Sequence, residues 1–201
     1  MHTWTNQPYE TMWNHLLFFS RKSAVSGLLT GQIQSNRQFD VPSHLLERKS
    51  GQVAYAIHQA HEYFKAADTV TINTSPLLYF YGMLSLAKAL IVAVQPNTLL
   101  EAIPYHGLAT TPPKGKYPHL ESYVKDHTQW RMDKEYAITK GGVFQELTKT
   151  TDEFTFPDDA VIRYKDLLAI NPELAQMYAR YYGEKPRVQS VGCRGSFPCE
   201  L

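Results

Sequence analysis

The chain has 201 residues, of which 43% are hydrophobic and 19% are charged, so it holds enough apolar material for a folded core. This composition excludes disorder over most of the length. Twenty lysines and arginines against nineteen acidic residues give a net charge of +1. That balance provides no bulk electrostatic reason to bind nucleic acid or an anionic membrane.

The two ends of the chain indicate compartment and domain limits. No basic segment followed by an apolar run opens the sequence, so we expect no secretory signal and a cytoplasmic location. Cys193 and Cys199 lie in the last nine residues and form neither a disulfide framework nor a zinc site. We expect one mainly helical domain over residues 1–185 and an irregular tail over residues 186–201, or else a natural protein that continues beyond this end.

Hydrophobic periodicity predicts helices through the first half of the chain. Residues 9–20 predict an amphipathic helix, whereas residues 21–38 contain Gly27 and Gly31 and predict broken helix and loop. Residues 53–67 carry the clearest period, with apolar side chains every three or four positions. These side chains are Val53, Ile57, Ala60, Phe64 and Ala67.

Residues 77–94 form a long apolar run, preceded by Ser75 as the expected N-cap and Pro76 in the first turn. At ~1.5 Å per residue the run would span about 27 Å, which is long enough to consider a membrane-spanning helix. Lys88 lies past its middle, and a central lysine costs ~2.5–3.5 kcal/mol on insertion. We therefore expect the buried central helix of a bundle.

The second half of the chain is less regular. Residues 128–147 show irregular alternation and include the turn pair Gly141-Gly142, which predicts a small β excursion. A last helical element follows at residues 166–182. Its cap, first-turn and stop residues are Asn171, Pro172 and Gly183. The predicted fold class is mostly α, a helical bundle core with this small β excursion.

No motif of metal or nucleophilic chemistry is specific enough to name a reaction. His58 and His61 lie three residues apart with Glu62 after the second, whereas the zincin pattern needs histidines at i and i+4 with Glu beside the first. We interpret them as surface histidines. Phosphate-binding loops, the dinucleotide fingerprint and the Gly-x-Ser-x-Gly elbow do not occur in the sequence. We therefore expect no catalytic residue, no metal and no cofactor.

Lys88 and His106 are the candidate binding residues. A lone lysine on an apolar helix must reach water, a carboxylate or a bound anion, because burying it unpaired is costly. His106 lies before Gly107 in the loop that follows this helix, and the loop is long enough to fold back toward Lys88. Together they would bind a phosphate or a carboxylate. The alternative keeps them apart, with Lys88 extended to solvent and His106 capping a turn.

Four separated segments carry a family resemblance. They are the helix at residues 75–90, the pair His106-Gly107, the Gly-Val-Phe segment at residues 142–144, and residues 166–174. In this order they resemble the YaaC-like family of bacterial proteins over about residues 50–182. The family brings no established activity, so the resemblance implies relatives rather than a reaction. Its members are longer than this chain, and the departure begins after residue 184.

Two neighbouring helices, at residues 60–67 and 77–90, carry a second resemblance. They are similar to the two core helices of HEPN domains, bundles that include ribonucleases of defence and toxin systems and nucleotide-binding partners. The nuclease members carry an arginine, four to six residues and a histidine late in the bundle. This chain has one match to that spacing, from Arg37 to His44. About one match is expected by chance, and Pro42 within it argues against a helix.

Two classes of function stay open. The first is a non-catalytic cytoplasmic module, binding or regulatory, that recognises a nucleotide, an RNA or a protein partner and not a membrane. The second is a HEPN-like ribonuclease or toxin acting in phage defence. An enzyme brings arginine, histidine or tyrosine together in one cleft, whereas a binding module exposes an apolar or aromatic patch. The sequence does not indicate the oligomeric state.

Overall fold

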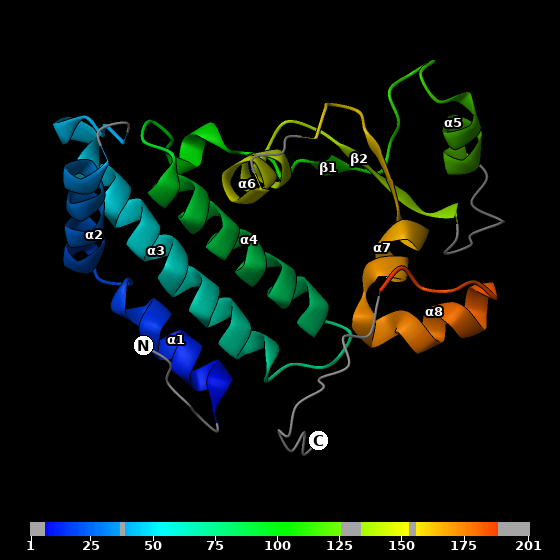
Figure 1. Cartoon of the computed structure of the whole chain (residues 1–201), viewed down its shortest axis with the longest axis horizontal. Coiled ribbons are helices and arrows are strands. Elements are labelled where there is room, and N and C mark those ends of the chain that lie inside the picture. The colour runs from blue at the N-terminus through cyan, green and yellow to red at the C-terminus, as the bar shows by residue number, and fades with distance from the viewer. Residues whose placement is uncertain (1–6, 37–38, 126–133, 153–155, 189–201) are drawn as a thin grey trace. The chain divides into compact units, whose positions relative to one another are not determined.

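Helices make up most of this chain, and a small three-stranded sheet accompanies them (Figure 1). The computed structural model describes residues 7–36, 39–125, 134–152 and 156–188. The chain divides into two units, one of residues 1–108 and 140–157 and the other of residues 109–139 and 158–201. The mostly α fold with a small β excursion is confirmed.

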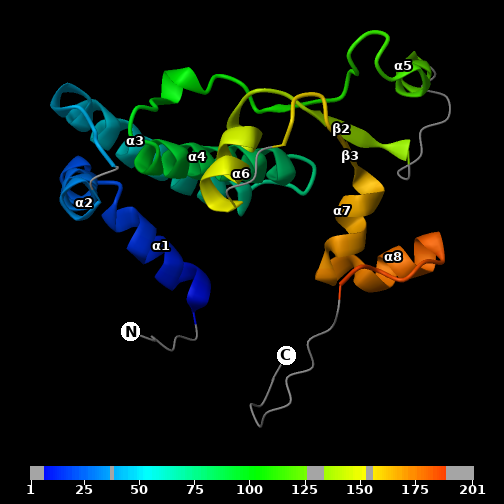
Figure 2. The same ribbon diagram turned by 45° about the horizontal axis from the view of Figure 1, so that its top comes forward.

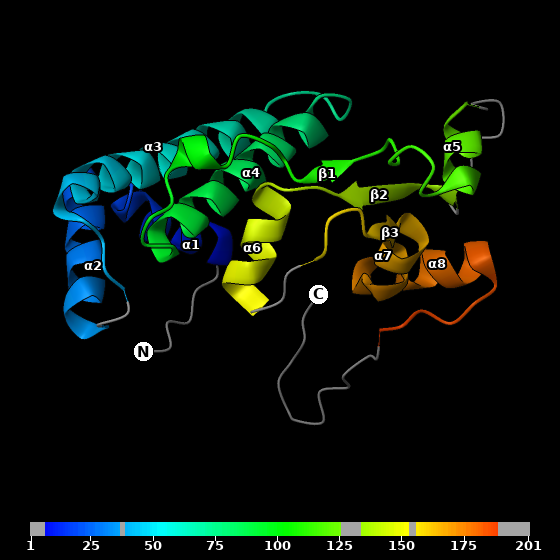
Figure 3. The ribbon, with the colours of Figure 1, turned by 90° about the horizontal axis from the view of Figure 1, so that it is seen from above.

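The first unit is a helical bundle. Its described helices are α1 (Pro8–Phe18), α2 (Lys22–Ser35), α3 (Ser43–Ala67), α4 (Ser75–Val94), the short 3-10 helix η1 (Leu100–Ala102) and α6 (Val143–Asp152). α3 and α4 lie side by side as a hairpin, and α1 and α2 both pack on α3 (Figures 1 and 2). α6 comes about fifty residues after α4 and packs on it (Figure 3).

Small side chains let α3 and α4 approach each other closely. Buried small residues recur on α4 at spacings of three and four, and they are Gly82, Ser85 and Ala89. A Cβ atom at Gly82 would lie 2.6 Å from two ring carbons of Phe64 on α3. That ring is held on two sides, with centroids 5.3 Å from Trp13 and 5.5 Å from Tyr79. The helix crossing therefore requires a glycine at position 82.

The apolar core of the first unit lies where these helices meet. It draws buried side chains from α2, α3, α4 and α6 and from the segments before α3 and after η1. They are Val25, Leu29, Phe39, Val41, Val53, Ala54, Ala56, Ile57, Ala89, Ile91, Val92, Ile103 and Val143. This arrangement fixes one side of α4 against α3 and a neighbouring side against α6.

The second unit contains most of the sheet and the last helices. Strands β1 (Leu108–Ala109), β2 (Tyr136–Thr139) and β3 (Val161–Arg163) lie in the order β1-β2-β3, and β2 and β3 are antiparallel. The helices are α5 (Pro118–Lys125), α7 (Tyr164–Ile170), the 3-10 helix η4 (Pro172–Leu174) and α8 (Ala175–Tyr182). The Asn171 side chain accepts from the backbone N–H of Glu173 at 3.0 Å, and Gly183 ends α8 at φ 67°. The expected cap and stop are confirmed, but the single helical element expected at residues 166–182 is divided into α7, η4 and α8, because Asn171 is extended and begins a new turn.

Several expected boundaries are wrong for physical reasons. The broken helix expected at residues 21–38 is the continuous helix α2, because Gly27 and Gly31 lie on its open side while Val25 and Leu29 are buried. Burial on one face outweighs a glycine cost of about 1 kcal/mol per residue. The helix expected from residue 53 begins ten residues earlier, at Ser43.

The cap of α4 and the extent of the sheet also differ from expectation. Ser75 is the first residue of α4, and Thr74 before it makes no side-chain cap hydrogen bond. Only β2 lies in the expected β region, since residues 143–147 belong to α6 and residues 126–133 lie outside the described part. β1 and β3 have two and three residues, too few to show a period of two.

Replacing Gly82 with alanine tests the close helix crossing. Helix propensity alone would stabilise Gly82→Ala by about 1 kcal/mol, but the new methyl group overlaps the Phe64 ring, and overpacking costs about 1–3 kcal/mol. We expect a net loss between about zero and about 2 kcal/mol in the free energy of unfolding, measured by urea denaturation. Gly27→Ala is the matched control in open space and should stabilise by about 0.5–1 kcal/mol. Equal effects of both variants would contradict the crossing.

Candidate functional site

The side chain of Lys49 on α3 is fully buried, at 0% exposure. Its ammonium donates to the backbone carbonyl oxygens of Val92 at 2.6 Å, Gln95 at 2.7 Å and Thr98 at 3.0 Å. Burial lowers the pKa of Lys49 from 10.5 to about 8, whereas the carbonyls at the C-terminal end of α4 favour the charged form. All three donor hydrogens of a lysine are thus used by backbone. Lys49 holds the end of α4 and is not available to a ligand.

The segment that follows α4 is held on α3 by a second side chain. Gln52 accepts from the backbone N–H of Leu100 at 2.9 Å and donates to the Glu101 carboxylate at 2.8 Å. Arg48 forms an ion pair with the same carboxylate. Residues 95–101 are therefore positioned by one turn of α3.

Gln95 connects the same segment to α6. Its Nε2 donates to the Glu146 carboxylate at 2.7 Å and to the Thr150 hydroxyl at 3.1 Å. Its Oε1 accepts from the Thr98 hydroxyl at 2.7 Å. This amide, half-buried, links the end of α4 to the helix that covers one of its sides.

Two of the segments that carry the family resemblance meet backbone to backbone. The N–H of Val143 donates to the Tyr105 carbonyl at 3.0 Å, and the N–H of Phe144 donates to the His106 carbonyl at 3.0 Å. The first two residues of α6 thus begin on the loop that carries His106. The contact joins the His-Gly pair to the Gly-Val-Phe segment.

The contact is close enough to require glycine on both sides. Gly142 has φ 152°, and a Cβ atom there would lie 2.6 Å from the Tyr105 carbonyl oxygen and 2.8 Å from the Gly107 nitrogen. Gly107 has φ 87°, and a Cβ atom there would lie 2.9 Å from the Phe144 nitrogen. Side chains rarely adopt such backbone conformations, and here backbone atoms also fill the space.

The structure gives the two candidate binding residues different surroundings. The exposed His106 ring packs edge-to-face on Phe80, with centroids 5.4 Å apart. Lys88 is half-buried, and no hydrogen bond or ion pair holds it within the described residues. Phe80 precedes Lys88 by eight residues, which is ~12 Å along the helix axis. His106 therefore folds back onto α4 two turns before Lys88, and an anion site shared by the two stays a prediction.

The other candidate residues are dispersed. His58 is exposed, and His61 packs on Trp13 with ring centroids 5.1 Å apart. Arg37 lies outside the described residues, and His44 is exposed in the first turn of α3. Over the described ranges, no group of three or more His, Cys, Asp or Glu side chains could hold a metal ion.

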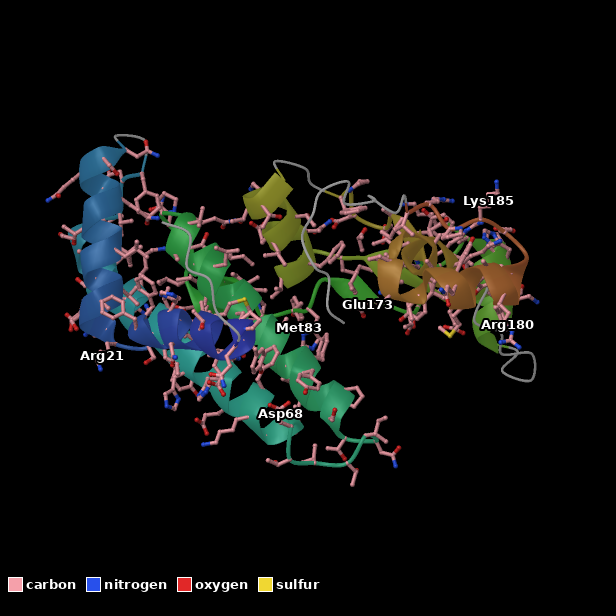
Figure 4. The ribbon with its side chains drawn as sticks, turned by 60° about the horizontal axis from the view of Figure 1, so that its bottom comes forward. Arg21, Asp68, Met83, Glu173, Arg180 and Lys185 are labelled. Carbon is pink, nitrogen blue, oxygen red and sulfur yellow. The ribbon has the colours of Figure 1, made fainter. Side chains whose placement is uncertain are left out.

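A row of apolar side chains on α4 faces solvent. Its members are Phe80, Met83, Leu90 and Val94, which we call the outer stripe. These four side chains are 41%, 57%, 42% and 40% exposed in chain order, whereas the intervening Ala87 packs against the core of the unit. Figure 4 places Met83 on this helix and Asp68 at the end of α3. The central helix is thus covered on the sides that face α3 and α6 and bare on another.

By length and composition α4 could cross a membrane, and 28% of its apolar window is buried. This is weak evidence for a span, because core helices pass the same test. Its closest neighbour, α3, carries five charged side chains, which are Glu47, Arg48, Lys49, Glu62 and Lys65. A hairpin in which one helix is this polar does not suit a bilayer core.

A small pocket lies in the second unit between α7 and α8. It has a volume of about 80 Å³ and an apolar and aromatic lining of Leu168, Leu174, Met177, Tyr178, Tyr181 and Tyr182. Pockets for drug-sized ligands and cofactors measure roughly 300–1,000 Å³. This pocket is therefore too small for a nucleotide.

Replacing Lys49 tests its role at the end of α4. We expect Lys49→Met to lower the free energy of unfolding by about 2 kcal/mol or more, because the buried carbonyl of Val92 and the partly buried carbonyls of Gln95 and Thr98 lose their donor. Lys65→Met on the exposed side of the same helix should stay within about 0.5 kcal/mol of wild type.

The unfolded chain binds the Lys49 proton up to pH 10.5 but the folded chain only to about pH 8. The stability of wild type relative to Lys49→Met should therefore rise across this window, by at most ~1.4 kcal/mol per pH unit. A flat difference would contradict the lowered pKa.

Replacing Gly142 tests the contact that begins α6. Gly142→Ala should cost about 2 kcal/mol or more, because the methyl group overlaps backbone and the φ value is strained. Gly141→Ala is the matched control, since its Cβ would meet only the Gln145 Oε1 at 3.9 Å. Thermal denaturation of both variants checks this. A Gly142→Ala protein as stable as the control would show that the two segments do not meet as described.

Comparison with known proteins places the chain in a family. A family model described as YaaC-like Protein matches residues 16–197, which include most of both units. No curated protein and no solved structure matches the chain, so the resemblance to HEPN domains stays a prediction. The family match extends beyond residues 50–182, over which the four segments carry the resemblance. The chain belongs to the YaaC-like protein family.

Proposed function

We propose that this chain is a non-catalytic binding module of the bacterial cytoplasm, and that it recognises a partner protein through the outer stripe of α4. The observation that carries the proposal is the exposure of Phe80, Met83, Leu90 and Val94 on a helix whose opposite side is also apolar. A helix that is apolar all round is normally covered all round. Contiguous exposed apolar patches of this kind are typical of interaction sites.

The side chains of the outer stripe favour a protein partner over a nucleic acid. RNA and nucleotides are bound chiefly through cations that neutralise phosphates. The outer stripe contains no cation, α4 carries only Lys88, and the whole chain has a net charge of +1. A partner with its own apolar surface fits these side chains better than a polyanion does.

The alternative function, a HEPN-like ribonuclease or toxin in phage defence, needs an arginine and a histidine that converge on one cleft. Its sequence match begins at Arg37, outside the described residues, and ends at the exposed His44. The pocket between α7 and α8 is small and has no histidine or charged side chain in its lining. The distribution of side chains therefore supports a binding module more than an enzyme.

Three equally exposed methionines make a matched test. Met83 on α4 is 57% exposed, Met12 on α1 is 59% exposed, and Met177 on α8 is 55% exposed. A photo-crosslinking residue placed at each position in turn, in the native host, should capture one defined protein from position 83 only. The captured protein, produced separately, should bind the wild-type chain at least tenfold more tightly than Met83→Glu, because a carboxylate in an apolar contact must be desolvated.

Met12→Glu should bind that protein as wild type does, since it lies on another helix. Crosslinking to lipid, equal capture from all three positions, or equal affinity of Met83→Glu and wild type would each argue against the proposal. Cleavage of RNA by the purified chain would favour the alternative.

A further inference from the structure

We propose that the pocket between α7 and α8 binds a quaternary ammonium group, such as the headgroup of choline or the tip of a trimethylated lysine side chain. The pocket lies in the second unit and shares no residue with the outer stripe, so it is a site separate from the one in the proposed function. Its lining includes three tyrosine rings, which are Tyr178, Tyr181 and Tyr182. The face of a tyrosine ring carries partial negative charge and attracts cations.

The three tyrosines lie on one side of α8 and present rings of different orientation. Their spacing of three and four residues makes them neighbours on the helix surface. The ring centroid of Tyr182 lies 4.8 Å from that of Tyr178, with 44° between the ring planes, and 4.8 Å from that of Tyr181, with 80°. Because all three rings line one pocket, a cation placed there meets rings from more than one direction.

The rest of the lining is apolar, and this selects among charged groups. It consists of Leu168, Leu174 and Met177, and the pocket surface exposes almost no polar atom. A primary ammonium has three N–H donors and would lose hydrogen bonds to water here without replacing them. A quaternary ammonium has no N–H donor and covers its charge with methyl groups, so it loses no hydrogen bond. A phosphate or carboxylate would need donors that this lining lacks.

The size of the pocket suits a headgroup of this kind. A cavity of roughly 150 Å³ holds benzene, which has six heavy atoms. The pocket has a volume of about 80 Å³, so it has room for about three or four heavy atoms. A trimethylammonium group, one nitrogen with its methyl carbons, is of this size. Met177 and Tyr181 in the lining are 55% and 61% exposed, so the pocket opens to solvent and the rest of a ligand extends outward.

A carboxylate beside the pocket makes one of the rings a stronger cation acceptor. The Tyr178 hydroxyl donates to Glu184 Oε2 at 2.9 Å, and the Lys165 ammonium donates to Glu184 Oε1 at 2.7 Å. The hydrogen bonds from Lys165 and Tyr178 hold the pKa of Glu184 below its usual value, so this carboxylate is charged at neutral pH. A negative charge against the hydroxyl polarises the phenol and increases the electron density of its ring.

A second ring of the pocket already attracts a cation of the chain itself. Lys165 Nζ lies 5.1 Å from the Tyr182 ring centroid, within the distance of about 6 Å at which cations and aromatic faces attract each other. Lys165 lies outside the pocket lining, so it does not fill the pocket. Its charge and that of Glu184 compensate each other, and the pair leaves no net charge to repel a bound cation.

Isothermal titration calorimetry of the full chain tests the class of ligand. The probes are choline and dimethylbutanol, the isostere in which a carbon atom replaces the ammonium nitrogen. We expect choline to bind at least tenfold more tightly than the isostere, because only choline carries the charge that the rings attract. Equal affinities would show a merely apolar pocket and overturn the proposal, as would the absence of choline binding at tens of millimolar.

A peptide with a trimethylated lysine, compared with the unmodified peptide, separates the two sources of the group. Tighter binding of the methylated peptide than of choline assigns the site to a modified protein, and tighter binding of choline assigns it to a free small molecule. Binding of the unmodified peptide as tight as that of the methylated one would overturn the selection for a quaternary ammonium.

Matched variants test whether the tyrosine rings supply the attraction. Tyr181→Leu keeps an apolar side chain but removes the aromatic face, and it should weaken choline binding at least fivefold, whereas Tyr181→Phe should stay within about threefold of wild type. Tyr105→Leu, 71% exposed in the first unit, is the control and should bind choline as wild type does. Glu184→Gln keeps an acceptor for Tyr178 but removes the charge, and it should weaken choline binding at least twofold. A Tyr181→Leu protein that is folded by circular dichroism and binds choline as tightly as wild type would overturn the site.

Discussion

The contact between the Lys49 ammonium and three carbonyls at the end of α4 is the constraint on which the rest of the first unit depends. A helix end leaves four carbonyls without partners inside the helix, and Val92 near the end of α4 is buried. One buried cation satisfies the carbonyls of Val92, Gln95 and Thr98, and it also compensates the negative end of the helix dipole. The turn after α4 is thereby fixed on α3, where Gln52 holds its next residues.

The position of this turn determines which sides of α4 are covered. Gln95 carries the link onward to Glu146 on α6, and the glycines at 107 and 142 let the loop and the start of α6 meet at backbone distance. α6 therefore lies against one side of α4, while the small residues beginning with Gly82 bring α3 against another. The outer stripe is what these two contacts leave bare. Its exposure follows from polar contacts at the end of the helix as much as from its own apolar sequence.

Much of the fold could be predicted from the sequence where the period or the cap chemistry is strong, as at residues 9–20, residues 53–67 and Asn171. The helix α2 could not be predicted, because its glycines lower the helix propensity of the segment. Only packing against α3 offsets this loss, and the sequence does not show that packing. The sequence does not indicate that α3 begins before residue 53, because Lys49 interrupts the apolar period. Lys49 lies four residues before Val53 on the same face of the helix, but it is charged, whereas core positions are normally apolar. A lysine in register with an apolar stripe is the signal that could have revealed it. The outer stripe gives no such signal, because a helix that is apolar all round does not indicate which side its neighbours will cover.

An exposed apolar surface of this kind lowers the stability of the protein unless a partner covers it. Each exposed apolar Å² forgoes about 25 cal/mol of stabilisation that burial would provide, and a long apolar helix at the surface invites non-specific association. Specific pairing avoids that association only if the surface selects one partner geometry. Lys88, which has no ion-pair partner among the described residues, provides such a selection, since a surface that buried it deeply would have to desolvate its ammonium. The charge therefore limits how the covering surface approaches α4, and this limit favours a partner that leaves one edge of the helix open to water.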